Sequence, residues 1–403
     1  MIPRNFLFAG AVLALLPALP LQVANAQEMP GVTATEIKVG STFPFSGPAS
    51  ALGNVGKGLM VYVDHINDTG GINGRKIKLI ALDDAYTPGK SVEQNRKLVE
   101  SDGVAFIFSP LGTAAISANL KYMNINKVPQ LFVVTGGDKF TDHATYPYTT
   151  TAMPSYNTEG KVYAKFINEK LPKARIAILY QNDDMGKDLV GGVRSFLKDD
   201  YDKRVVAKAY EVTDPTIDSQ IVTLKSSGAE AFFFAGSPKF GAQTIRKIRE
   251  IGWNPLMVIN VAASSVASAL TPAGLDNSKG ITTSTFLKDP TDPTWTDDPA
   301  VKNYRTILAK YLPVADPSEG FYLYGFAQGE ILKKLLEQCG NDLSRENIMK
   351  QALNIKNFSP TLAARGLKIN TSPTNNQAYL GLQLQEFNGR SWVPFGGVVS
   401  AAD

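Results

Sequence analysis

Short apolar runs alternate with longer segments of helical periodicity along the first half of the chain. Residues 37–42 alternate and are rich in β-branched side chains, and in residues 54–66 apolar side chains recur at helical spacing. Further apolar runs lie at 76–82, 105–108 and 130–134, and further helical segments lie at 87–100 and 113–126. Because helices separate these segments, and those at 105–108 and 130–134 lack polar alternation, the pattern predicts a parallel sheet covered on both faces.

A second series of the same kind begins near Met153-Pro154. Its apolar runs lie at 175–180, 204–210, 231–235 and 256–261, and its helical segments at 161–171, 186–198, 219–226 and 239–251. Two such series predict an α/β protein with two doubly wound parallel-sheet lobes. Helical segments follow at 300–311, 321–338 and 345–354, and Asn388-Gly389 between two strand-like runs predicts a two-residue hairpin.

The N-terminus reads as a secretory signal. Arg4 precedes an apolar stretch at 6–21, and Ala24-Asn25-Ala26 has the small-x-small pattern of a cleavage site. We therefore expect residues 1–26 to be removed and the exported chain to start at Gln27. The alternative, a membrane anchor, is disfavoured because the stretch is short and two prolines interrupt it. We expect no direct membrane insertion of the mature chain.

Composition excludes several classes of protein. The chain has 403 residues, 44% of them hydrophobic, so it can bury a large core without disulfides, which a single cysteine, Cys339, cannot form within the chain. The formal net charge is +4 with no basic cluster, so no nucleic-acid partner is expected. No phosphate-binding loop, nucleophile elbow or paired metal-ligand spacing is present, so we expect no enzyme, no cofactor and no metal.

The informative segments are the loops at the carboxyl ends of the predicted strands, where open α/β sheets bind ligands. In the first series these are 44–52, 109–114 and 135–138, which are rich in small and hydroxylated residues and precede helices. Helix N–H groups together with Thr113 or Thr135 suit a carboxylate. The alternative is that these are ordinary tight turns. In the second series, the loops contribute Asp183, Asp184, Met185, Ser237, Phe240 and Asn260, of which the two aspartates could simply cap a helix.

At this point the chain resembles a known family: the periplasmic solute-binding proteins of ABC importers, of the leucine/isoleucine/valine-binding class. The matching segments, in order, are Ile37-Lys38-Val39-Gly40 with Phe45-Ser46-Gly47-Pro48, Gly70-Gly71-Ile72-Asn73-Gly74-Arg75, Asp83-Asp84 before Thr87-Pro88, and Ile176-Ala177-Ile178-Leu179-Tyr180 before Asp184. The resemblance covers nearly the whole mature chain.

The resemblance implies two lobes that close on a ligand about a multi-segment hinge, the periplasm as location and a membrane permease as partner. It implies a first lobe of residues 27–150 and 283–374 and a second of 151–282 and 375–403. The implied ligand contacts are Leu52, Gly112, Thr113, Gly136, Gly137 and Asp138 in the first lobe, and Met185, Ser237 and Val261 in the second, with Tyr324 as a further wall residue. We expect a monomer.

The sequence departs from the family where amino-acid binders place an acidic side chain against the ligand's ammonium group. That stretch reads Ile259-Asn260-Val261-Ala262, without an acid. Burying an ammonium group without a partner carboxylate costs several kcal/mol. Asp138 either replaces the missing acid or points to solvent. We therefore expect a carboxylate ligand without an α-amine, an aromatic or other organic acid. The alternatives are a branched-chain or other amino acid, a ligand-sensing receptor subunit, and a secreted enzyme.

Overall fold

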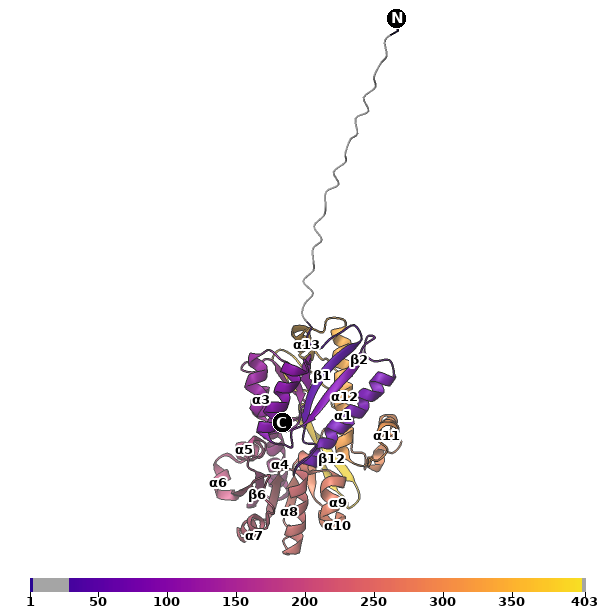
Figure 1. The fold of residues 1–403 in the computed structure, drawn as a ribbon. Helices are drawn as coiled ribbons and strands as arrows, with labels where there is room; N and C mark the ends of the chain where they lie inside the picture. Colours follow the sequence, from indigo (N-terminus) through magenta and orange to yellow (C-terminus); the bar gives the residue numbers. More distant parts are fainter. Residues whose placement is uncertain (3–28, 401–403) are drawn as a thin grey trace.

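The structure, a computed structural model, describes residues 1–2 and 29–400. The apolar stretch of the predicted signal peptide and its cleavage site lie outside these residues. Across the described part of the chain, no helix has both the length and the apolar character to span a membrane. The described residues form two sheets, one of five strands and one of seven. Each sheet is covered by its own set of helices (Figure 1).

The first sheet is wholly parallel, with strand order β2-β1-β3-β4-β5. Its strands are β1 Glu36–Phe43, β2 Lys76–Asp83, β3 Phe106–Phe108, β4 Gln130–Val133 and β5 Thr149–Thr151. Its helices are α1 Asn54–Asp68, α2 Pro88–Arg96, α3 Thr113–Ile125, α11 Pro299–Tyr311, α12 Gly320–Cys339 and α13 Arg345–Ala352. The first series of apolar runs therefore forms the parallel sheet that its pattern predicts.

The second sheet has the order β12-β11-β10-β9-β8-β6-β7. Its strands are β6 Ile176–Gln181, β7 Val205–Tyr210, β8 Ala231–Ala235, β9 Leu256–Ile259, β10 Thr282–Thr285, β11 Gly381–Phe387 and β12 Trp392–Ser400. Its helices are α4 Tyr156–Lys170, α5 Asp184–Leu197, α6 Tyr201–Arg204, α7 Asp218–Ser226, α8 Pro238–Glu250, α9 Thr271–Ala273 and α10 Leu275–Ser278. β6 to β10 are parallel, whereas β11 and β12 add an antiparallel hairpin to the edge.

The chain passes between the two sheets in three places. It leaves the first sheet after β5, returns after β10, and crosses again before β11. A parallel bridge between Thr151 and Gln377 sets the first and third crossings side by side. Since β10 pairs with β9 and β11, the return crossing follows Thr285, whereas the expected division at residue 283 would cut this strand. The rest of the lobe division stays a prediction.

The predicted hairpin forms, but its turn is longer than predicted. Phe387 pairs with Trp392, which leaves residues 388–391 as a four-residue loop. The side-chain Oδ1 of Asn388 accepts hydrogen bonds from the backbone N–H groups of Arg390 and Ser391 at 2.8 and 3.0 Å. Together with the backbone hydrogen bond from the N–H of Asn388 to the carbonyl oxygen of Ser391 at 3.1 Å, this asparagine turn closes the loop without the predicted two-residue geometry.

Helices α1 and α12 pack against each other because glycines lie where they meet. A Cβ atom at Gly58 would lie 2.2 Å from the carbonyl oxygen of Tyr322, and one at Gly325 would lie 2.1 Å from that of Val55. Gly56 also allows α1 to rest on Phe43 of β1, as expected for a helix that starts close to the sheet. This packing fixes the start of α1 next to the start of α12, which carry Val55 and Tyr324.

We expect Gly58→Ala to lower the free energy of unfolding by about 1–3 kcal/mol, because the added methyl group meets backbone atoms that cannot rotate away. Urea denaturation checks this. The matched control is Gly89→Ala in α2, where a Cβ meets nothing within 4 Å and alanine favours the helix. Equal urea midpoints for the two variants would contradict the packing described here.

Candidate ligand-binding site

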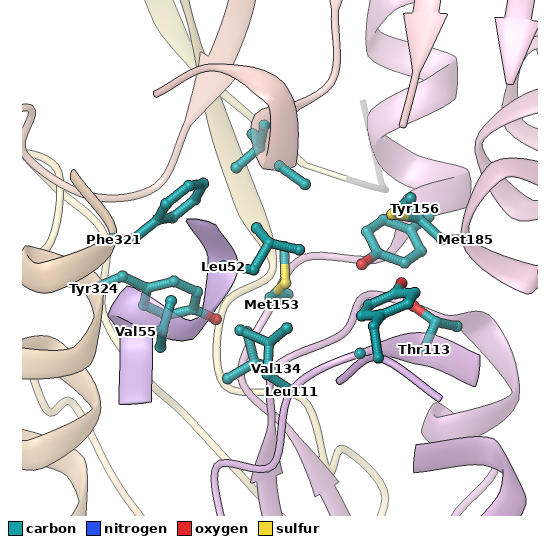
Figure 2. A pocket seen from close by; sticks show the side chains of 14 residues that line it. Leu52, Val55, Leu111, Thr113, Val134, Met153, Tyr156, Met185, Phe321 and Tyr324 are labelled. Atoms are coloured by element: carbon teal, nitrogen blue, oxygen red, sulfur yellow. The ribbon is translucent and has the colours of Figure 1, made fainter. Parts of the chain in front are cut away.

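A pocket lies where the carboxyl ends of the two sheets face each other, with about 460 Å³ of empty space, its open mouth included. Its walls come from loops and helices that follow strands of the two sheets, and from α12 (Figure 2). The lining residues are Leu52, Val55, Tyr86, Leu111, Gly112, Thr113, Val134, Met153, Tyr156, Met185, Val261, Ala262, Phe321 and Tyr324. Among these described residues none carries a formal charge. The pocket therefore offers a ligand apolar contacts and hydroxyl groups.

The start of α3 forms a polar end of the pocket. The helix begins at Thr113, and the preceding Gly112, at φ 112°, has no side chain to cap it. Thr113 Oγ1 and Thr135 Oγ1 are 2.9 Å apart, and Thr135 Oγ1 accepts from the backbone N–H of Gly137 at 3.1 Å. Uncapped helix N–H groups attract anions. The geometry at Thr113 therefore suits a carboxylate oxygen.

Two tyrosines lie near this polar end. Tyr156 comes from the start of α4, and its phenol points toward Thr113 (Figure 2). Burial raises the pKa of Tyr156 to about 12 and that of Tyr86 well above its ordinary value, so both phenols stay neutral. The O–H of Tyr86 already donates to Asp183, so Tyr156 is the phenol that can donate to a ligand. Tyr86 has a left-handed backbone at φ 58°, held by a hydrogen bond from its N–H to Asp84 Oδ1 at 2.9 Å. This conformation is unfavourable for tyrosine and indicates a constrained position.

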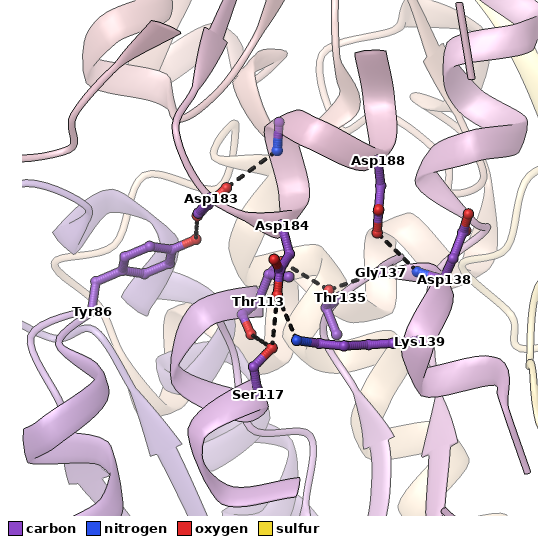
Figure 3. A network of polar contacts seen from close by, with 11 residues as sticks. Tyr86, Thr113, Ser117, Thr135, Gly137, Asp138, Lys139, Asp183, Asp184 and Asp188 are labelled. Carbon is purple, nitrogen blue, oxygen red and sulfur yellow. Dashed lines mark hydrogen bonds and ion pairs between the residues drawn. The ribbon is translucent and has the colours of Figure 1, made fainter. Parts of the chain in front are cut away.

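The N-terminal half of α5 contacts the first lobe through three aspartates (Figure 3). Asp184 pairs with Lys139 at 2.5 Å and accepts from Ser117 Oγ at 3.4 Å. Asp188 Oδ2 accepts from the backbone N–H of Asp138 at 3.0 Å. Asp183, the N-cap of α5, accepts from the Tyr86 hydroxyl at 3.5 Å. These bonds join the second lobe to the segments after β2 and β4 and to helix α3, so the two lobes are closed on the pocket.

The three carboxylates differ in pKa because their contacts and their burial differ. The hydrogen bond from Lys139 lowers the pKa of Asp184, whereas burial raises the pKa of Asp188 to about 6 and also raises that of Asp183. Asp183 caps α5 through the N–H of Gly186 at 3.2 Å, as the capping alternative predicts.

Asp138 does not line the pocket. Its Oδ1 accepts from the hydroxyl of Ser155, the N-cap of α4, at 2.5 Å. The carboxylate of Asp138 is thus hydrogen-bonded to a residue at the first crossing between the lobes. The structure gives no support to the alternative in which Asp138 replaces the missing acid of the second lobe.

A carboxylate does lie beside the second-lobe stretch that has no acid in the sequence. Glu159, in α4, accepts from the backbone N–H of Val261 at 2.7 Å and from the hydroxyl of Tyr163 at 2.8 Å, both at Oε1. The side chain is buried, and desolvation raises its pKa to about 7. The interpretation that this region lacks an acid was therefore incomplete. Glu159 was missed because it precedes the helical segment expected at 161–171, and nothing in the sequence distinguishes it from a surface glutamate.

Only some of the predicted contacts lie around the pocket. Leu52, Gly112, Thr113, Met185, Val261 and Tyr324 line it. Thr135, Gly136, Gly137 and Asp138 stand behind this lining, where Gly136 leaves room for the ring of Tyr156. Ser237, Phe240 and Asn260 do not line it either. Their role as ligand contacts, like that of the lining residues, stays a prediction.

The three second-lobe residues outside the lining serve the core. Phe240 is fully buried and packs on Tyr210, with ring centroids 4.5 Å apart. The N–H of Ser237 donates to the Tyr210 hydroxyl at 3.1 Å. Asn260 Oδ1 accepts from the N–H of Gly236 at 2.9 Å. Their positions after strands are correct, but their side chains point into the lobe.

Sequence reasoning missed much of the apolar lining and two of its hydroxyl groups. The residues missed are Val55, Tyr86, Leu111, Val134, Met153, Tyr156, Ala262 and Phe321. Tyr86 follows β2, so the rule that ligands bind at carboxyl ends of strands could have found it. Met153 and Tyr156 lie at a crossing between the lobes, for which the apolar pattern gives no signal.

The fold is two-lobed, and the pocket lies between the lobes. A family model described as "Periplasmic binding protein" matches residues 36–391, and the chain belongs to this family. It is 23% identical to the Leu/Ile/Val-binding protein homolog 7 of Brucella abortus over 91% of this chain and 93% of that protein. It is 24% identical to the leucine-, isoleucine-, valine-, threonine- and alanine-binding protein of Pseudomonas aeruginosa, over 86% and 87%.

Solved structures share the fold. A branched-chain amino acid ABC transporter protein from Thermus thermophilus with bound valine has a TM-score of 0.82 at 16% identity, over 91% of this chain and 97% of that chain. A fatty acid ABC transporter substrate-binding protein from Thermomonospora curvata has a TM-score of 0.75 at 19% identity, over 93% and 95%. The type I periplasmic binding protein fold predicted from the sequence is thereby confirmed.

Glu159 should make stability depend on pH. Its pKa is raised from 4.5 to about 7, so its stabilising contribution is full below 4.5 and is lost as the pH rises through about 7. The free energy of unfolding of the wild-type protein should therefore fall by on the order of 2 kcal/mol between about pH 5 and 8 because of Glu159. We expect Glu159→Gln, which keeps an acceptor for Val261, to lack this part of the fall. Urea denaturation across this range measures it. Glu169→Gln, at an exposed position of the same helix, is the control and should leave the pH profile unchanged.

Lys139→Met should favour the open arrangement of the lobes. Because the side chains of Lys139 and Asp184 are 39% and 45% exposed, we expect the pair to contribute no more than about 1 kcal/mol, less at high salt. Small-angle X-ray scattering without ligand, at low ionic strength, should show a larger radius of gyration for Lys139→Met than for the wild-type protein. Lys121→Met, on the exposed side of α3, makes the same charge change without a partner in α5. An equal radius for both variants would contradict a closing role for Lys139.

Proposed function

We propose that this chain is an extracytoplasmic solute-binding protein that captures a small carboxylate between its lobes and delivers it to the membrane permease of an ABC importer. The observation that carries the proposal is the uncapped start of α3 at Gly112-Thr113, which opens into a pocket of otherwise apolar and hydroxyl character. Membership of the periplasmic binding protein family supports the location and the class of partner. Two solved structures with this fold are named as proteins of ABC transporters.

The uncharged lining favours an aromatic or other organic acid. Helix N–H groups and the neutral phenol of Tyr156 can hold one carboxylate, while the apolar side chains around them suit a ring or chain. An ammonium group in the same space would meet no carboxylate in the lining. Leaving it unpaired would cost several kcal/mol.

The second candidate is an amino acid, as the names of the relatives favour. In that case four acids bond to lining residues: Glu159 to Val261, Asp84 and Asp183 to Tyr86, and Glu319 to Phe321. All four already accept hydrogen bonds within the protein, and burial raises the pKa of each. We therefore place the amino acid second. A ligand sensor with the same site would differ from an importer protein in its partner, which would be a signalling protein instead of a permease. A secreted enzyme would differ by releasing a converted product.

We expect Thr113→Val to weaken the binding of benzoate about 5- to 100-fold, because it removes a hydroxyl at the anion end without changing the shape of the side chain. Isothermal titration calorimetry measures this, with leucine as the competing ligand class. The control is Thr244→Val, which removes a buried hydroxyl in α8, away from the pocket.

Two results would count against the proposal. Leucine bound tightly by a protein that ignores benzoate would make the amino acid the ligand. Equal benzoate affinity for both threonine variants would remove Thr113 from the anion end. Native mass spectrometry of the freshly purified protein, with identification of any retained compound, gives an independent answer.

A further inference from the structure

The hydroxyl of Tyr324 is buried, lines the pocket and lacks a hydrogen-bond partner within the described part of the chain. Only 7% of the side chain is exposed. Burial raises the pKa of this phenol well above its ordinary value, so it keeps its proton and can donate. A buried polar group without a partner destabilises a protein, and native structures contain few of them. The vacant donor therefore needs an explanation.

Other unpartnered polar groups lie beside this hydroxyl. Gln328, one turn further along α12, is fully buried, and neither its amide nitrogen nor its amide oxygen has a partner in the described chain. Its amide offsets part of the rise in the pKa of Tyr324, so the two groups are close, although their atoms do not meet hydrogen-bond geometry. The Tyr379 hydroxyl is also unpartnered, and both tyrosine rings contact Phe286, with centroids 5.4 and 5.1 Å away. Of these groups only Tyr324 reaches the pocket.

The position of Tyr324 separates it from the anion end. Figure 2 shows Tyr324 and Phe321 on one side of the pocket and Thr113 and Tyr156 on the other. The side chains of Leu52, Met153 and Val134 lie between them. The pocket thus has a polar end, an apolar middle and a second, isolated donor. A simple aromatic or aliphatic acid would fill the first two and leave the third unpaired.

We propose that the Tyr324 hydroxyl is a second anchor, which selects carboxylates that carry a hydrogen-bonding oxygen at the end opposite the carboxylate, across an apolar ring or chain. This inference rests on the proposed function and narrows its ligand class to acids with two polar ends. A hydroxyl or carbonyl group at the far end accepts from the phenol. An acid with a methyl group or a hydrogen atom there leaves the donor unpaired, as it is without ligand, and so lacks the affinity that this hydrogen bond adds.

Calorimetry with matched acids tests this. One pair is 4-hydroxybenzoate and benzoate, and the other is 6-hydroxyhexanoate and hexanoate, in case the pocket takes a chain instead of a ring. In at least one pair, we expect the wild-type protein to bind the hydroxylated acid about fivefold or more tightly. Tyr324→Phe should bring that ratio close to one, mainly by weakening the hydroxylated acid.

The control is Tyr379→Phe, which removes a buried, unpartnered hydroxyl that does not line the pocket and should keep the wild-type ratio. Thermal denaturation of the ligand-free variants shows that each is folded. A ratio of one in both pairs for the wild-type protein, or a preference that survives in Tyr324→Phe, overturns the inference while the carboxylate function stands. If none of the four acids binds, the proposed function fails, and this inference fails with it.

Discussion

The contact between the start of α5 and the first lobe is the interaction on which the site depends. Asp184 and Asp188 reach Lys139 and the backbone of Asp138, and Asp183 reaches Tyr86. Each bond ties a second-lobe carboxylate to a loop that follows a first-lobe strand. Met185 lies between these aspartates and enters the pocket, so the closing contacts and the lining come from the same turn of helix. Without this contact the lobes would present two open surfaces in place of an enclosed site.

The acids near the pocket accept hydrogen bonds from other groups of the protein, and the lining itself is uncharged. Asp138 holds the N-cap of α4, Asp183 caps α5, and Glu159 fixes the backbone at Val261. A carboxylate held in this way cannot turn toward a ligand without giving up a bond inside the protein. The charge that a ligand brings must then be met by helix N–H groups and by hydroxyl groups, which favours an anion over a cation.

The sequence predicted the fold well because apolar periodicity reports burial, and burial decides which segments become sheet strands. It located Thr113 and Met185 for a similar reason: both follow buried strands and open helices. It could not tell on which side of a turn a side chain lies, so Ser237 and Phe240, which turn toward Tyr210, looked equivalent to Met185. Tyr156 and Glu159 were beyond reach, because their roles depend on where the first crossing places α4 relative to Thr113 and Val261.

The distribution of the lining over the two lobes indicates an order of binding. The start of α3, Tyr86 and Tyr324 all belong to elements of the first lobe, whereas Met185, Val261 and Ala262 bring only apolar contacts from the second. A ligand can therefore satisfy most of its polar groups on the first lobe while the site is open. Closure then adds apolar burial, the phenol of Tyr156 and the bonds of α5. Apart from the Tyr156 phenol, these terms do not depend on the ligand's charge. Under the proposed function, the first lobe therefore makes most of the selection, and the second lobe retains the ligand that has been selected.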